Sequence, residues 1–330
     1  MSGILLAPTM QAQTQAAPLK LVQTIPFKGY TGDFDHFAVD GQRHRLLLAA
    51  EDHATLEVFD LNTMKHLRTI GGFGAPHAIL VRPGASTLLV TDSGPGMSKL
   101  LDPSTYAEKG IVKLVPGADS IGYDAAANLV YVVTGGKDVK MSTSDLQAVN
   151  PDTGKLVRSI HFNSNHVEAM ALEKHGDRLF INLTDKNEIA VVNRKTGKIL
   201  ATWPVPPAKM NSMVSFDEAA HRLYIVCRDP GMLVVMNSDT GAVIDSRPTP
   251  DTADGMAMDL ASHRIYIPGG VGWIGVYDIS NPDQPKMIAK VPSATGAKSC
   301  ILLPKMHRFI VARSPGDTGA LGKVMVFDVR

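Results

Sequence analysis

The chain has 330 residues, of which 33 are Lys or Arg and 32 are Asp or Glu, so its net charge is +1. A nucleic-acid-binding protein usually carries a basic excess, and this balance therefore argues against that class. No apolar run reaches the roughly 18 residues that a membrane-spanning helix needs. Two cysteines are too few for a disulfide framework or a four-thiolate zinc site, and no CxxCH motif for covalent haem is present.

The first residues have features of a shortened export signal. An apolar run at residues 3–8 is followed by Thr14 and Ala16, small residues that suit signal-peptidase cleavage after Ala16. No Lys or Arg precedes the run, and the run is short for such a signal. Residues 1–17 are predicted to be a signal-peptide remnant, which implies a periplasmic or secreted protein. The alternative is a disordered tail on a cytoplasmic protein.

A short apolar strand that ends in Asp or Asn recurs seven times along the chain. Successive copies end 41 to 50 positions apart, a period typical of the blades of a β-propeller. The seven copies are Leu56–Asp60, Lys99–Asp102, Leu146–Asn150, Ile189–Asn193, Leu233–Asn237, Ile274–Asp278 and Val324–Asp328.

The residues around each copy complete a four-stranded unit. Upstream lies a run rich in β-branched and aromatic residues, such as Leu129–Thr134, which favours a strand. Downstream lies a tight turn such as Asp152-Thr153-Gly154-Lys155, in which glycine supplies the positive φ that a hairpin requires. A last strand follows, for example Leu156–Ile160.

The C-terminal unit lacks its fourth strand, because the chain ends at Arg330 just after the third. Leu19–Ile25 has the pattern of the missing strand, and its pairing with the last unit closes the ring and removes an exposed sheet edge. The sequence therefore predicts an all-β fold: one seven-bladed β-propeller domain over residues 18–330, with four-stranded blades and N-terminal ring closure.

One repeat also resembles a known family. Tyr131-Val132-Val133-Thr134, followed by the turn at Asp152–Lys155, is similar to the YVTN repeat of YncE-like propeller proteins. The resemblance spans about residues 19–330. Such propellers include binding proteins, surface-layer proteins, subunits of quinoprotein dehydrogenases and relatives of lactonases. A fold that hosts so many activities leaves the function to be argued from a site.

Polar residues gather in the loops that are expected to surround one mouth of the central channel. These loops lead into the innermost strand of each blade or join its second and third strands. Basic residues there suit carboxylates or phosphates, unless neighbouring acids neutralise them. The candidate ligand-binding residues are Asp35, His53, Asp119, Glu168, Asn211, Arg228, Asp254, Lys298 and Arg313.

Three histidines occupy equivalent positions in blades one, two and four. His36, His77 and His166 each stand where the chain enters the innermost strand, so they are expected to converge on the axis. With Glu168 they suit a divalent metal, and a neutral imidazole also serves as a general acid or base. The alternative is that each one hydrogen-bonds a neighbouring blade.

The remaining candidate residues are expected to have structural roles. Five histidines lie in the turns between first and second strands, which place them on the opposite face: His44, His175, His221, His263 and His307. Cys227 and Cys300 fall within strands and are expected to be buried thiols.

The sequence thus favours an exported propeller that binds a small ligand or a partner protein at the channel mouth, with neither a nucleic-acid partner nor a membrane span. The first alternative is a metal-assisted lyase or hydrolase of the lactonase type, in which His36, His77 and His166 are catalytic. The second alternative is a subunit of a periplasmic redox complex. No cofactor follows with certainty from these residues beyond a divalent metal as a candidate.

Overall fold

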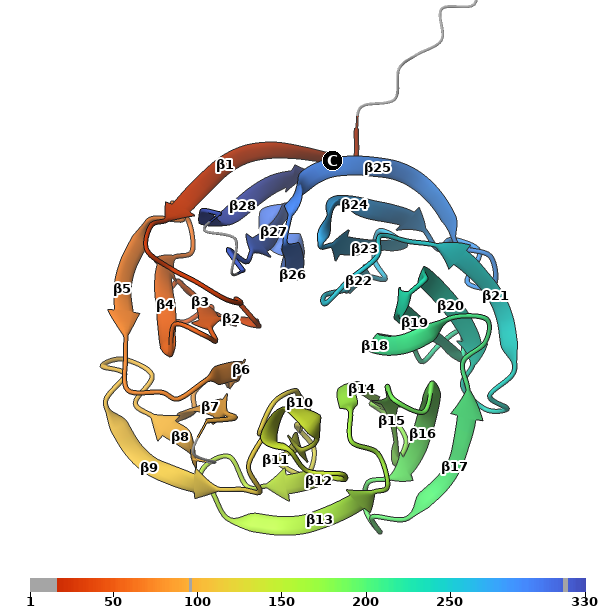
Figure 1. The fold of residues 1–330 in the computed structure, drawn as a ribbon, viewed down its shortest axis with the longest axis horizontal. Coiled ribbons are helices and arrows are strands. Elements are labelled where there is room, and N and C mark those ends of the chain that lie inside the picture. The colour runs from red at the N-terminus through yellow and green to blue at the C-terminus, as the bar shows by residue number, and fades with distance from the viewer. Residues whose placement is uncertain (1–16, 95–96, 317–319) are drawn as a thin grey trace, which may run out of the picture.

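The chain forms seven four-stranded antiparallel sheets. Figure 1 shows that the sheets are arranged in a ring about one axis. The computed structural model describes residues 17–94, 97–316 and 320–330. Within those ranges the only helices are two short 3-10 turns, η1 (Lys137–Val139) and η2 (Pro304–Met306), and no helix is long and apolar enough to span a membrane. The predicted all-β, seven-bladed propeller is confirmed.

The first four blades follow one another along the chain, each with its strands in sequential order. Blade 1 contains β2 (Phe37–Asp40), β3 (Arg45–Ala50), β4 (Thr55–Asp60) and β5 (His66–Ile70). Blade 2 contains β6 (Pro76–Leu80), β7 (Leu88–Asp92), β8 (Met97–Leu101) and β9 (Glu108–Lys113). Blade 3 contains β10 (Ile121–Asp124), β11 (Leu129–Gly135), β12 (Ser144–Val149) and β13 (Leu156–Phe162). Blade 4 contains β14 (Val167–Leu172), β15 (Arg178–Leu183), β16 (Glu188–Asn193) and β17 (Ile199–Pro204).

The last three blades complete the ring. Blade 5 contains β18 (Lys209–Asp217), β19 (Arg222–Asp229), β20 (Gly231–Asn237) and β21 (Val243–Pro248). Blade 6 contains β22 (Ala257–Asp259), β23 (Arg264–Gly269), β24 (Val271–Asp278) and β25 (Lys286–Thr295). Blade 7 contains β26 (Ala297–Leu303), β27 (Arg308–Arg313), β28 (Gly322–Val329) and β1 (Leu19–Phe27).

The N-terminal strand closes the ring, as the sequence predicts. β1 pairs antiparallel with β28, from Leu19 opposite Val329 to Phe27 opposite Gly322. The strand extends two residues beyond the predicted Ile25, and Phe27 is buried between blades 7 and 1. The export signal predicted for residues 1–17 lies almost wholly outside the described residues.

The hydrophobic core consists of seven clusters, each of which lies between two neighbouring blades. Alternate residues of a central strand face opposite sides of the sheet, so one strand serves two clusters. In β4, Val58 packs toward blade 2 and Phe59 packs toward blade 7. This sharing explains why the marker strands are apolar at successive positions rather than alternating.

The turns on the face opposite the channel mouth have a repeated backbone geometry. His44, His221, His263 and His307 have positive φ, between 50 and 57°. The carbonyl of each accepts a hydrogen bond from the residue after its marker strand, for example from the Leu61 amide to His44. These histidines therefore have the predicted structural role, and they lie away from the channel mouth.

Candidate functional site

A strongly charged cavity of about 180 Å³ lies at the channel mouth. Its lining includes seven acidic residues, three histidines and only three Lys or Arg residues. Nine of the residues predicted from the sequence line it: Asp35, His36, His77, Asp119, His166, Glu168 and Asp254, together with Arg228 and Lys298 on its cationic side. The excess of carboxylates gives the cavity a negative potential, which favours a cation.

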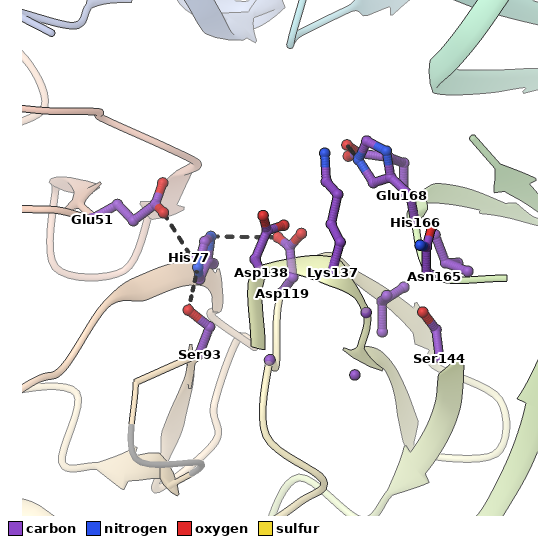
Figure 2. A pocket seen from close by; sticks show the side chains of 15 residues that line it. Glu51, His77, Ser93, Asp119, Lys137, Asp138, Ser144, Asn165, His166 and Glu168 are labelled. Atoms are coloured by element: carbon purple, nitrogen blue, oxygen red, sulfur yellow. Dashed lines mark hydrogen bonds and ion pairs between the residues drawn. The ribbon is translucent and has the colours of Figure 1, made fainter. Parts of the chain in front are cut away.

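His77, at the start of β6, is the centre of the acidic side. Its Nδ1 lies 2.6 Å from Asp35 Oδ2 and 3.5 Å from Asp119 Oδ1. Its Nε2 lies 2.8 Å from Ser93 Oγ and 3.7 Å from Glu51 Oε1. Figure 2 shows the ring between Glu51 and Asp119. Groups from blades 1, 2 and 3 thus converge on one imidazole.

These contacts shift the ionisation of the histidine and its nearest acid in a consistent direction. Burial by itself lowers the pKa of a histidine, but the carboxylates of Asp119 and Asp35 outweigh it and raise the pKa of His77 well above its ordinary value. Burial likewise opposes the charge on Asp35, yet His36 and His77 hold the pKa of that carboxyl below its usual range. In the metal-free protein the two form a buried ion pair.

Two other carboxyls of the cavity are shifted the opposite way. Burial, reinforced by neighbouring carboxylates, raises the pKa of Glu51 to about 7 and that of Asp119 to about 6. His77 opposes both shifts but does not reverse them. Around neutrality the cavity therefore holds carboxyl groups that gain or lose a proton readily, a property suited to a general acid or base.

The raised pKa of Glu51 predicts a pH-dependent effect of Glu51→Gln. The folded protein holds this proton more tightly than the unfolded chain does, so the ionised Glu51 carboxylate destabilises the fold. This cost is absent below the ordinary pKa of 4.5 and is fully present once the pH has risen through about 7. The variant is expected to be more stable than the parent at pH 8, by on the order of 2 kcal/mol, with little difference at pH 4.5.

Urea unfolding at both pH values, in the presence of EDTA, measures this difference. Asp138→Asn is the matched control, because it removes another carboxylate of the same cavity for which no carboxyl–imidazole contact is present among the described residues. An equal change in unfolding free energy at pH 4.5 and pH 8 would show that the Glu51 proton is not held as described.

The opposite side of the cavity is a chain of ion pairs that joins four blades. Arg228, at the end of β19, contacts Glu168 Oε1 at 2.9 Å and also pairs with Asp254. Lys298 Nζ lies 3.3 Å from Asp254 and 2.8 Å from Asp33. Both cations are therefore neutralised by acids of the protein. Of the two possibilities that the sequence leaves open, the contacts favour this one over the capture of an acidic ligand.

The three equivalent histidines separate into two environments. His36 Nε2 lies 3.5 Å from Asp35, whereas His166 Nε2 lies 2.8 Å from Glu168, on the side of Arg228. Two groups of metal-ligand atoms lie within 4.8 Å of one another: Asp35, Glu51 and His77, and Asp35, His36 and Asp119. Among the described residues neither group includes His166 or Glu168. Each group contains one of the other two histidines, and Asp35 belongs to both groups.

Three of the candidate ligand-binding residues lie outside the cavity lining. His53 stacks on the Tyr30 ring, with 3.8 Å between centroids. Asn211 is fully buried and donates to Asn182 Oδ1 and the Glu188 carbonyl. The Arg313 guanidinium donates to the carbonyls of Thr295 and Leu321. These contacts tie loops and blades together.

Other residues of the site are Asp33, Glu51, Ser93, Lys137 and Asp138. The sequence pattern places Glu51, Lys137 and Asp138 among the polar residues of the mouth loops, whereas it singles out neither Asp33 nor Ser93. Each of these residues lies in a loop of the channel-mouth face, the one signal that was available for them. Lys137, in η1, is next to Asp138 at the edge of the cavity (Figure 2), and no carboxylate oxygen of the described residues lies within 4.0 Å of its Nζ.

The thiols play no part in the cavity. Burial raises the pKa of Cys227 to about 12 and also raises the pKa of Cys300. Both remain protonated at neutral pH and are unreactive, as expected of thiols within strands.

The chain matches no model of a known protein family and no curated protein. The YVTN-type resemblance of the repeat therefore stays at the level of the motif. Among solved structures, "Kuenenia stuttgartiensis Hydrazine Synthase" is similar, with a TM-score of 0.74 and 15% sequence identity. The match covers 90% of this chain and 97% of that one. At this identity the likeness shows the propeller fold and nothing of its chemistry.

Proposed function

We propose that this propeller binds a small polar ligand at the channel mouth through a divalent cation. The observation that carries the proposal is the convergence of Asp35, Glu51 and His77, with His36 and Asp119 beside them, on one cavity. Mixed carboxylate and imidazole donors suit first-row transition metals such as Mn²⁺, Fe²⁺ and Zn²⁺. A cation there also neutralises carboxylates that otherwise repel one another.

The surroundings of the cation favour a ligand with an anionic group. Lys137 has no carboxylate partner within 4.0 Å among the described residues, whereas Arg228 and Lys298 are both paired. An anion bound to the metal is therefore expected to meet the Lys137 ammonium. The cavity volume of about 180 Å³ fits a small molecule better than a protein segment, although a partner protein over the mouth stays an alternative.

A metal-assisted lyase or hydrolase is the second candidate. If a metal is held by the second group, Asp35, His36 and Asp119, then Glu51 is left free as a general base; its pKa is raised to about 7 and its Oε1 lies 3.7 Å from His77 Nε2. Turnover of ester, lactone or phosphate-ester substrates by the metal-loaded protein would favour this reading over binding alone. Export remains a prediction from residues 1–17.

Metal titration tests the proposal directly. Protein stripped with EDTA and returned to chelator-free buffer at pH 8 is titrated calorimetrically with Mn²⁺, Zn²⁺ and Ca²⁺, because imidazole must lose its proton to bind metal. Saturable binding of about one transition-metal ion per chain is expected. Elemental mass spectrometry of protein purified without an affinity tag or chelator gives the native occupancy. Absence of saturable binding for all three ions would overturn the proposal.

A further inference from the structure

A second, larger cavity lies between blades 3 and 4, on the face opposite the channel mouth. Its volume is about 440 Å³. Successive strands run antiparallel, so the turns from β10 to β11, from β14 to β15 and from β16 to β17 all lie on the face away from the channel mouth. Those three turns, together with β11 and β13, form its walls. We call it the blade 3–4 pocket.

The blade 3–4 pocket carries an excess of positive charge. Its lining includes four Lys or Arg residues and two Asp residues. Arg194 Nη1 lies 3.1 Å from Asp124 Oδ2, and Lys195 Nζ lies 2.9 Å from Asp177 Oδ1. These two pairs use both carboxylates of the pocket, so they leave two cations of the lining without an acidic partner.

The unmatched cations are Arg158 and Lys174. In the part of the chain that the structure describes, no carboxylate oxygen lies within 4.0 Å of either side-chain cation. Arg158 Nη1 donates to the Arg194 carbonyl, which orients its guanidinium but supplies no negative charge. Arg194 is 8% exposed, and its Nε–H also has no acceptor among the described residues. This side of the pocket therefore has positive charge and an N–H donor available for an anion.

The rest of the lining consists of the imidazole of His175, the backbone of Gly176 and an apolar side. Leu129 and Tyr131 of β11 contribute one side, and Ala126 and Ala127 of the preceding turn extend it. Leu129 is partly exposed, whereas Tyr131 is 1% exposed and donates its hydroxyl hydrogen to the Arg194 carbonyl, so Tyr131 fixes the position of this wall. Cationic groups beside apolar groups match a ligand that has both an anionic head and an apolar body.

We propose that the blade 3–4 pocket is a binding site for a small organic anion, a phosphate or carboxylate attached to a compact apolar group. Arg158 and Lys174 hold the anionic head, and the Leu129–Tyr131 side receives the apolar body. A planar guanidinium and a flexible ammonium together suit both head groups, since each accepts charge-assisted hydrogen bonds. The site is separate from the channel mouth and does not depend on the proposed metal.

The test uses phenyl phosphate as the probe, titrated calorimetrically into the full chain at pH 8, at low salt and with EDTA present. EDTA keeps the channel mouth free of metal. Saturable binding is expected, with weaker binding of inorganic phosphate and of phenol, because each lacks one half of the recognised structure. Benzoate distinguishes the head groups: tighter binding than phenyl phosphate would assign the site to carboxylates, and weaker binding would assign it to phosphates.

Lys174→Met tests whether the probe binds in this pocket, because Lys174 lines the pocket and is exposed. The variant is expected to bind phenyl phosphate about tenfold more weakly, the effect of one charge-assisted hydrogen bond. Lys65→Met, an equally exposed lysine in blade 1, is the matched control and is expected to bind like the parent. Equal affinity of the Lys174 variant and the parent, or inorganic phosphate binding as tightly as phenyl phosphate, would overturn the proposal.

Discussion

Asp35→Asn is expected to abolish stoichiometric binding of a divalent transition metal at the channel mouth. Asp35 is the one residue that belongs to both groups of potential metal ligands. Its Oδ2 lies 2.6 Å from His77 Nδ1, and its side chain is 13% exposed, so it is fixed in place before a metal arrives. A neutral carboxamide of the same shape removes the negative ligand while it keeps the volume.

The affinity for Mn²⁺ or Zn²⁺ is expected to fall at least about 100-fold. Mutation of a residue that only hydrogen-bonds a metal ligand already lowers metal affinity by about 10- to 100-fold, and Asp35 is expected to be a ligand itself. Isothermal titration at pH 8 measures it, and thermal unfolding confirms that the variant is folded. Asp138→Asn is the control, since it removes one carboxylate of the same cavity that belongs to neither group. Equal loss in both variants would mean that the cavity attracts cations only through its overall charge.

The fold could be predicted because every repeat uses the same residues for the same physical reason. The marker strands pack against both neighbouring blades, so they remain apolar wherever they occur, as Val58 and Phe59 illustrate. Ring closure followed from the one strand missing at the C-terminus. The meeting of His36, His77 and Asp119 was also predictable, because equivalent positions in adjacent blades face the same axis.

The sequence predicted less well which of several neighbouring polar residues lines the cavity. Glu51 and His53 stand in one turn between β3 and β4, but Glu51 lies toward His77 whereas His53 stacks on Tyr30. The turn contains Ala54 at a φ of 58°, and of these two side chains only Glu51 lines the cavity. Residue types alone favoured the histidine.

The ion-pair and hydrogen-bond partners of the basic residues could not be predicted from the sequence either. Arg228 and Arg313 both stand near the end of the second strand of their blades. Arg228 meets two carboxylates, because Glu168 and Asp254 come from the blades on either side. Among the described residues, the side chain of Arg313 donates hydrogen bonds to the backbone carbonyls of Thr295 and Leu321. A distance of 60 positions separates Arg228 from Glu168, and only the closed ring brings them together.

Loss of Arg228 is expected to destabilise the fold strongly, because the closed ring places a carboxylate from each neighbouring blade beside its guanidinium. Its side chain, 20% exposed, joins Glu168 of blade 4 to Asp254 of the loop before blade 6, and its Nε donates to the Ala253 carbonyl at 3.2 Å. Arg228→Met removes that partner from the buried Glu168 and from the partly exposed Asp254, which leaves them with His166 and Lys298 respectively. Removal of one member of a buried ion pair typically costs about 3–5 kcal/mol, far more than the pair itself contributes.

Urea unfolding at pH 7 measures this cost against two controls. Arg45→Met breaks a more exposed pair, in which Arg45 Nη1 lies 3.6 Å from Asp60, and is expected to cost less than about 1 kcal/mol. The triple change Arg228→Met, Glu168→Gln and Asp254→Asn removes the three charges together, and it is expected to recover most of the lost stability because positions 168 and 254 then carry no negative charge that has lost its arginine partner. If the triple variant is as unstable as the single one, Arg228 stabilises the ring through packing of its stem, and the chain of ion pairs is not what holds blades 4 to 6 together.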